Sequence, residues 1–147
     1  MASVTFNQFS AKTSKVFDQL VRKTLIDLDR KLDERSPVGD ATYWKSPAPA
    51  GYVGGRFRGN WQYGYGSRPV GELDVTDKTG SATTAKIKAG IEAAPSIGVH
   101  FLTNNLPYAQ RIEKGWSRQA PLPHGVVGLA VLDFEGIVSR VAVEVSK

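Results

Sequence analysis

The stretch QFSAKTSKVFDQLVRKTLIDLDRKLDE, residues 8–34, decides the first part of the fold, because its apolar residues recur every three or four positions. This spacing places them on one face of an α-helix. Asn7 or Ser10 is expected to cap the start of the helix, and Pro37 is expected to end it. The apolar face consists of Phe17, Leu20, Val21, Leu25, Leu28 and Leu32. The sequence therefore predicts a long N-terminal helix that packs against a core.

The next segment, residues 36–59, is rich in Pro and Gly, which disfavour a regular element; we call it the arm. Structureless connections of this length are uncommon in small domains unless they have a function. The arm contains Tyr43, Trp44, Tyr52 and Phe57, which need to be covered. Either the domain's own surface or a neighbouring molecule can cover them.

The middle of the chain alternates between strand and helix patterns. Residues 60–68 are aromatic and alternating, which predicts a strand, and a weaker strand is expected near 73–75. Residues 81–94 indicate a helix with Ser81 as N-cap and Pro95 at its end. A strand over 96–104 follows, and then a two-turn helix over 107–115 with Pro107 at its first position.

The end of the chain, residues 125–145, is its most apolar part. A helix here has apolar residues on two sides, so both sides are expected to be buried, one of them against another subunit. Alternation of β-branched residues leaves a strand open as an alternative for 140–146. One helical stripe holds Val127, Ala130, Val131, Phe134, Ile137, Val138 and Val141, and the opposite side holds Leu129, Leu132 and Val143.

Together these patterns predict a single α+β domain over residues 1–147, with the arm at about 36–59. The expected architecture is a long N-terminal helix, a small antiparallel or mixed sheet with two short helices, and a C-terminal helix packed on the sheet. The first fifteen residues lack the apolar segment of a secretory signal peptide, and no apolar run approaches the roughly 20 residues that span a bilayer. We therefore expect no membrane partner.

Composition argues against most enzyme classes. The chain has no Cys, which excludes disulfides, thiolate zinc sites and a Cys nucleophile. His100 and His124 are the two histidines, and they do not stand at metal-ligand spacing. Glu113 and Glu135 are the best carboxylates for acid–base chemistry, but no nucleophile or base accompanies either. We expect no catalysis, no metal and no cofactor.

Two further features concern nucleic-acid binding. The net charge is +5, but the basic residues are spread along the chain without a run of five. Residues 51–59, GYVGGRFRG, have neither Walker A nor GxGxxG spacing, so their glycines are expected to let the arm bend closely over another surface. Arg56 and Arg58 can pair there with a phosphate or with a carboxylate of a neighbouring subunit.

Residues 104–121, NNLPYAQRIEKGWSRQAP, are too polar for a core and too rich in large side chains for a loop that only connects two elements. With the preceding VHFLTN (99–104), this segment resembles the signature of a tailed-bacteriophage family, the neck or tail-completion proteins, also described as minor tail or head–tail connector proteins. A second matching stretch lies at 36–62. The chain departs from the family at LPHGVV (122–127), where relatives have a link two residues shorter. The matching positions are Asn104, Asn105, Pro107, Tyr108, Ala109, Glu113, Gly115, Ser117, Gln119, Ala120, Pro121 and Gly125, and in the second stretch Gly55, Arg56, Arg58, Asn60 and Trp61.

The resemblance implies a structural virion protein, assembled in the bacterial cytoplasm, whose ring in the neck joins the DNA-filled head to the tail. Its implied partners are its own copies, six by tail symmetry or twelve by portal-side symmetry, the portal-side connector, and the tail-tube or tail-terminator protein. Genomic DNA would pass through the channel without sequence-specific contact. A tail terminator that caps the tube is the alternative, followed by a basic DNA-binding module.

Head-to-tail rings need two different surfaces, and interface cores are enriched in aromatic and Arg side chains. We therefore expect the arm and the 104–121 segment to contact partners. For Tyr108, packing onto the chain's own core is an equal alternative, whereas Trp116 lies in a charged neighbourhood that favours an interface. The predicted interface residues are Tyr43, Trp44, Tyr52, Arg56, Arg58, Trp61, Tyr108, Arg111, Glu113, Lys114, Trp116, Arg118 and Gln119.

Overall fold

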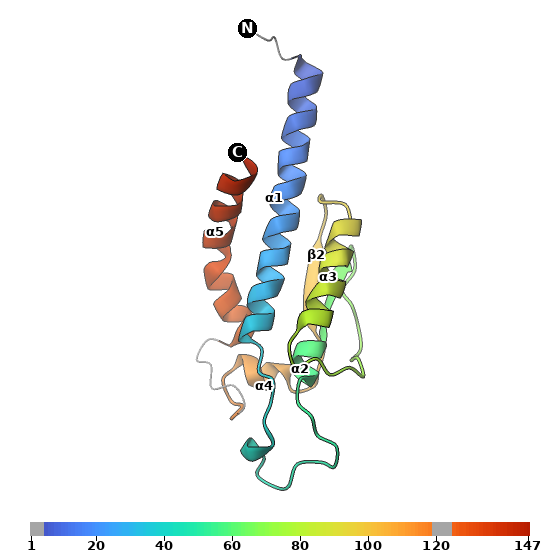
Figure 1. Cartoon of the computed structure of the whole chain (residues 1–147), viewed down its shortest axis with the longest axis vertical. Coiled ribbons are helices and arrows are strands. Elements are labelled where there is room, and N and C mark those ends of the chain that lie inside the picture. The colour runs from blue at the N-terminus through green and yellow to red at the C-terminus, as the bar shows by residue number, and fades with distance from the viewer. Residues whose placement is uncertain (1–4, 119–124) are drawn as a thin grey trace.

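A long helix, α1 (Phe6–Arg35), lies at the centre of the molecule, with a second helix on one side and a small sheet with its covering helix on the other (Figure 1). The structure is a computed structural model that describes residues 5–118 and 125–147. Within these residues the chain has five α-helices and one two-stranded antiparallel sheet, so the predicted α+β class and the long N-terminal helix are confirmed.

The start of α1 is capped by Thr5, and the prediction of Asn7 or Ser10 was wrong. The Thr5 hydroxyl accepts a hydrogen bond from the Gln8 amide at 3.3 Å, and the Gln8 side chain accepts one from the Thr5 amide at 2.9 Å. This reciprocal pair satisfies two amides at the helix start, and it places Asn7 and Ser10 inside the helix. The helix ends at Arg35, shortly before Pro37, as predicted.

The sheet pairs β1 (Trp61–Tyr65) with β2 (His100–Asn104), and Trp61 lies opposite Asn104. Both strands are shorter than predicted. The weak strand expected near 73–75 is absent, because the Asn60 side chain takes the place of a ladder partner there. Its Oδ1 accepts from the Leu73 amide at 2.7 Å, and its Nδ2 donates to the Leu73 carbonyl at 3.1 Å. The segment is therefore tethered to the sheet without joining it.

The short helices also differ from prediction. The arm contains a 3₁₀ turn, η1 (Ala41–Tyr43), and a single helical turn, α2 (Arg56–Gly59), so it is not wholly irregular. The helix α3 (Ser81–Ala93) has Gly80 as N-cap instead of Ser81, and it ends before Pro95 as expected. In α4 (Ala109–Glu113) the N-cap is Tyr108. Pro107 therefore lies in the preceding turn and not at the first helical position.

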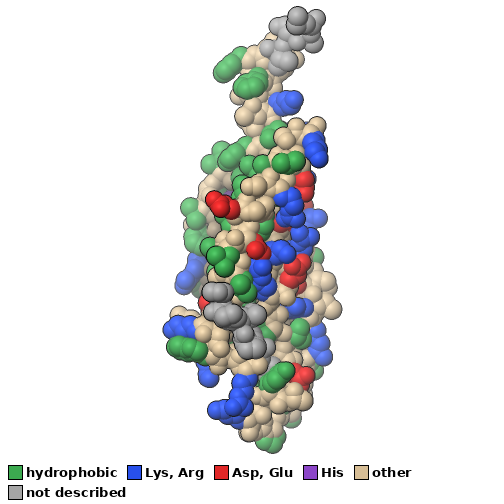
Figure 2. Space-filling model, turned by 90° about the vertical axis from the view of Figure 1, so that its left-hand side faces the viewer, with side chains coloured by type: hydrophobic (Ala, Val, Ile, Leu, Met, Phe, Trp, Pro, Cys, Tyr) green, Lys and Arg blue, Asp and Glu red, His purple; other side chains and the backbone are tan. Residues whose placement is uncertain are grey.

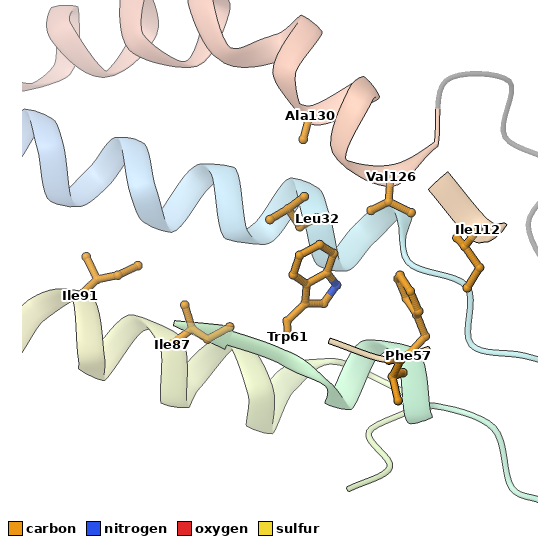
Figure 3. Close-up of a cluster of buried hydrophobic side chains, with 9 residues drawn as sticks. Leu32, Phe57, Trp61, Ile87, Ile91, Ile112, Val126 and Ala130 are labelled. Carbon is orange, nitrogen blue, oxygen red and sulfur yellow. The ribbon is translucent and has the colours of Figure 1, made fainter. Parts of the chain in front are cut away.

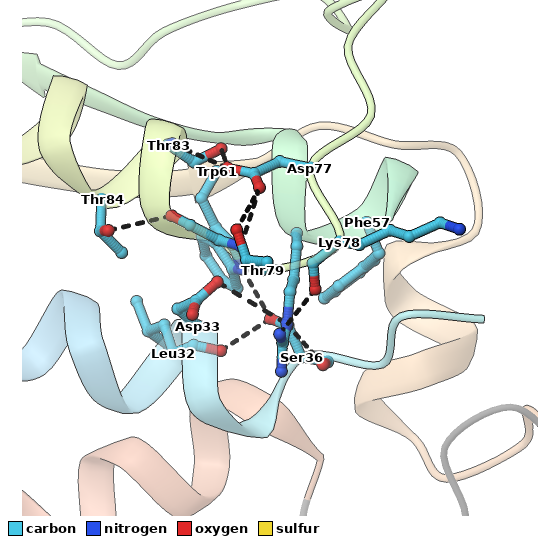
Figure 4. Close-up of polar contacts among 12 residues, drawn as sticks. Leu32, Asp33, Ser36, Phe57, Trp61, Asp77, Lys78, Thr79, Thr83 and Thr84 are labelled. Atoms are coloured by element: carbon cyan, nitrogen blue, oxygen red, sulfur yellow. Dashed lines mark hydrogen bonds and ion pairs between the residues drawn. The ribbon is translucent and has the colours of Figure 1, made fainter. Parts of the chain in front are cut away.

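Asp77 explains why Ser81 is not the cap of α3. Its carboxylate accepts hydrogen bonds from the Gly80 and Thr83 amides, each at 2.9 Å, and from the Thr79 and Thr83 hydroxyls (Figure 4). Burial alone would raise the pKa of Asp77, but these hydrogen bonds outweigh burial and leave the pKa below its ordinary value. A carboxylate from outside the helix thus satisfies its first amides.

The last helix, α5 (Val126–Val145), stays helical to its end, so the strand alternative for 140–146 is wrong. It packs along α1, and the buried residues Ala130, Ile137 and Val141 follow helical spacing. Packing against another helix therefore outweighs the β preference of the alternating valines.

The core gathers side chains from every layer around Trp61, which is 4% exposed at the start of β1 (Figure 3). Val126 and Ala130 of α5 share this cluster with Trp61, so the C-terminal helix meets the sheet there. The Trp61 indole donates to the Ser36 hydroxyl at 2.8 Å, which satisfies its polar atom inside the core. The other members are Leu32, Phe57, Ile87, Ile91, Leu106 and Ile112. No helix in the described ranges combines the length and apolar character needed to cross a membrane.

Candidate functional site

The arm and the region around α4 form an open hollow of about 590 Å³. Two stretches that are far apart in the sequence, 37–57 and 108–118, supply its walls. Residues from both stretches were predicted to contact partners, and the fold brings them to one place. Eight predicted interface residues line the hollow: Tyr43, Trp44, Tyr52, Arg56, Tyr108, Arg111, Trp116 and Arg118.

Close backbone approaches hold the arm beside the rest of the chain. The Gly55 amide donates to the Val38 carbonyl at 2.5 Å, and a Cβ at Gly55 would meet the backbone of Lys78 at 2.7 Å. A Cβ at Gly54 would meet the Gly39 carbonyl at 2.8 Å. Both glycines also have positive φ, so a larger residue would be strained at either position. The arm can fold back this tightly because glycine occupies both places.

Aromatic contacts organise the walls of the hollow. The Trp44 and Tyr52 rings meet edge to face at 5.3 Å between centroids, which orders two residues of the arm. Tyr108 lies 6.4 Å from Phe57, so its ring reaches from α4 to α2. Partial burial raises the pKa of Tyr108, and the Arg56 guanidinium opposes this shift. Tyr108 thus covers its own chain with one side and remains 38% exposed.

The charge of the hollow is positive. Arg56 forms ion pairs with Glu72 at 3.1 Å and Asp74 at 3.2 Å, and hydrogen bonding to Glu72 raises the pKa of its guanidinium. Among the described residues no carboxylate pairs with Lys45, Arg111 or Arg118, which also line the hollow. These three cations are therefore available to pair with acidic groups of a bound molecule.

Trp116 is the most exposed aromatic residue of the hollow, at 67%. The Lys114 ammonium lies over its ring, 4.7 Å from the centroid, so a cation–π contact orients both side chains at the rim. The prediction placed both residues at an interface, and the structure places both at the surface. Gln119, another predicted interface residue, and His124 lie outside the described residues.

Two predicted interface residues, Trp61 and Arg58, make their contacts inside the chain. Trp61 is buried in the core described above, so it is not a surface residue. Arg58 donates to the Ser36 carbonyl at 3.2 Å and to the Lys78 carbonyl at 2.9 Å, and lies 3.7 Å from Asp33. It ties the end of α1 to the segment before α3. Both side chains are thus used in internal packing, and their interface role stays a prediction.

Glu113 also serves the fold. Its carboxylate accepts hydrogen bonds from the Val126 and Val127 amides at 2.9 Å and from the Gly128 amide at 2.8 Å. These are the first amides of α5, which have no partner within the helix. Glu113 therefore caps α5 from α4, and its interface role stays a prediction. Gly125 permits this approach, because a Cβ there would clash with the backbone carbonyl and the carboxyl group of Glu113.

His100 is part of the sheet surface. One ring nitrogen pairs with the Tyr63 hydroxyl at 2.8 Å, and the other lies 3.2 Å from the Ser96 carbonyl. These contacts occupy both nitrogens. The described residues contain no group of three or more His, Asp or Glu side chains that could hold a metal ion.

Lining residues that sequence reasoning missed include Val38, Lys45 and Ile112. Lys45 follows Trp44 directly, so its place beside an expected interface residue was a usable signal. Ile112 carries no signal of this kind, because it lies in the core and reaches the hollow only through the fold.

Comparison with protein-family models, with curated proteins and with solved structures found no match for this chain.

Proposed function

We propose that this chain is a structural virion protein of a tailed bacteriophage, a subunit of the neck ring that joins the DNA-filled head to the tail. The sequence resemblance at 36–62 and 99–125 supports the phage assignment. The observation that carries a binding role is the convergence of aromatic and basic side chains from these two stretches at one hollow.

The hollow is suited to a segment of a neighbouring protein. Its aromatic walls can bury an apolar side chain, and Lys45, Arg111 and Arg118 can pair with carboxylates at its edge. Aromatic and Arg side chains of this kind dominate the binding energy of many interfaces. Other copies of the chain, the portal-side connector and the tail-tube or terminator protein are the proposed partners, in a ring of six or twelve copies.

The test is complementation of a phage that lacks this chain. Without it, electron micrographs are expected to contain full tailless heads beside free, finished tails. The variant Arg111→Ala/Trp116→Ala is expected to leave the same particles, because truncating such residues costs about 2 kcal/mol or more, about thirty-fold in affinity. Both side chains are exposed, so its melting temperature should match that of the wild type.

Lys86→Ala is the matched control, because Lys86 is exposed on α3 and lies away from the hollow. Infectious particles are expected with it. Overlong tails in the absence of the chain would instead support the terminator function. Complete, infectious virions without the chain would overturn the proposal.

A further inference from the structure

The first turns of α1 project beyond the helices and sheet that cover the rest of it (Figure 1). We call residues 6–17 the α1 tip. Phe6 is 83% exposed, Phe9 63% and Phe17 48%. With Thr13, these residues follow a spacing of three and four, so they share one face of the helix. This face continues into the buried position Thr24 further along the same stripe.

An isolated helix of this length is marginal in water, because helix stability in proteins comes mostly from packing of an apolar face. Three largely exposed Phe side chains on one face are also the kind of surface that marks a contact site. The α1 tip is therefore an uncovered apolar helix face suited to a contact with another molecule.

A second exposed apolar stripe lies on α5. Val127 is 44% exposed, Val131 64% and Phe134 46%, and their spacing of four and three places them on one side of the helix. We call them the α5 flank. It borders the residues that face α1, and hydrophobic side chains are visible on this side of the molecule and at the projecting end (Figure 2).

The charges beside these two stripes are opposite. Lys12 lies one turn from Phe9 on the α1 tip, and Glu135 lies one turn from Val131 on α5. Neither Lys12 nor Glu135 has an ion pair among the described residues. The α1 tip has no acidic residue before Asp18, so its charge favours an acidic neighbour.

From these complementary stripes and charges we infer that the α1 tip of one copy packs on the α5 flank of a second copy. The contact is heterologous, because it joins two different surfaces, so repetition produces a ring or a chain of copies. Three Phe side chains and their neighbours on α5 can bury on the order of several hundred Å², the range of weak, reversible contacts. The inference deepens the proposed function by naming the contact between copies, and it rests on that function for the choice of a second copy.

Cysteine cross-linking tests this contact directly, because the chain contains no Cys. Phe9→Cys and Val131→Cys are made as separate variants and mixed under mild oxidation. A cross-linked dimer is expected in the mixture, since a disulfide forms only where two Cβ atoms approach to about 4 Å. Each variant alone is expected to stay uncross-linked, because two α1 tips or two α5 flanks do not meet.

The control mixes Phe9→Cys with Val70→Cys, since Val70 is 82% exposed and lies in the loop before α3. Equal cross-linking of this pair, or self-cross-linking of Phe9→Cys alone, would overturn the inference.

A charge exchange gives independent evidence. Lys12→Glu is expected to weaken self-association in sedimentation, and Lys12→Glu/Glu135→Lys to restore it; absence of rescue would count against the contact.

The outcomes separate this inference from the proposed function. Self-association without the Phe9–Val131 cross-link would refute the contact and leave the neck assignment standing. A cross-link in a chain that virions do not need would support the contact and refute the neck assignment.

Discussion

Asp29 is a carboxylic acid on α1 with only 3% of its surface exposed. Burial, and secondly the negative charge of Asp33, raise the pKa of Asp29 from 3.8 to about 7. The folded state therefore keeps the proton between about pH 4 and pH 7, whereas the unfolded chain releases it. This contribution to stability is fully present below pH 3.8 and is lost as the pH rises through about 7.

The variant Asp29→Asn removes this titration with little change of shape. Each pKa unit corresponds to about 1.4 kcal/mol, so the wild type is expected to lose about 2–3 kcal/mol more unfolding free energy than the variant between pH 5 and pH 8. Urea unfolding at both pH values measures the difference. Asp74→Asn, at a fully exposed carboxylate, is the control, and an identical pH dependence of wild type and Asp29→Asn would contradict the prediction.

At the scale of elements, α3 and α5 begin in the same way. Each has a glycine at its N-cap, and no side chain at that position makes a capping hydrogen bond. A carboxylate from outside the helix accepts from the first amides instead: Asp77, three residues before the N-cap, for α3, and Glu113 of α4 for α5. A negative charge at a helix N-terminus also interacts favourably with the helix dipole. The Glu113 cap joins α4 to α5, and the Asp77 cap fixes the end of the loop before α3.

Glu113→Gln keeps the size of the side chain but removes its charge and one acceptor oxygen. We expect a loss of about 1–2 kcal/mol in unfolding free energy, because amides at the start of α5 lose a charged acceptor. Chemical denaturation measures this loss. Glu92→Gln removes an exposed carboxylate paired with Lys88 on α3, and it should change stability by less than about 0.5 kcal/mol. Equal effects of the two variants would show that Glu113 does not act as a cap.

At the scale of the whole molecule, apolar surface is divided between one shared core and uncovered helix faces. The core joins α1, α3, α4, α5 and the sheet around Trp61. The α1 tip and the outer side of α5 remain uncovered in the single chain. The same helix, α5, therefore serves the fold with one side and presents apolar residues to solvent with the other.

Two truncations on α5 test this division. Ile137 is 3% exposed, so Ile137→Ala is expected to cost about 2–5 kcal/mol of unfolding free energy. Leu132 is 70% exposed, and Leu132→Ala should change stability by less than about 0.5 kcal/mol. Thermal unfolding of dilute protein measures both, so that self-association does not contribute. A comparable loss for Leu132→Ala would place that side of α5 inside the fold.

The sequence predicted the kinds of residue that line the candidate site, but it did not predict every residue of the site. Trp44, Tyr108 and Trp116 were expected at an interface from residue type and neighbourhood, and they lie around one hollow. Trp61 and Glu113 carried the same signals, yet one is buried in the core and the other caps α5. Residue type reports what a side chain can do, whereas the packing around it decides which of these contacts forms.

Local sequence alone determined the α+β class, the extent of α1 and the position of the arm, because apolar periodicity and Pro/Gly content act between residues close along the chain. Tertiary structure decided that 140–145 is helical, that the arm and α4 meet at a hollow, and that one side of α5 is buried. These features depend on which distant surface each element packs against. Burial and hydrogen bonding between distant residues contribute more free energy than local propensity. These three features therefore depend on the tertiary fold and not on local sequence.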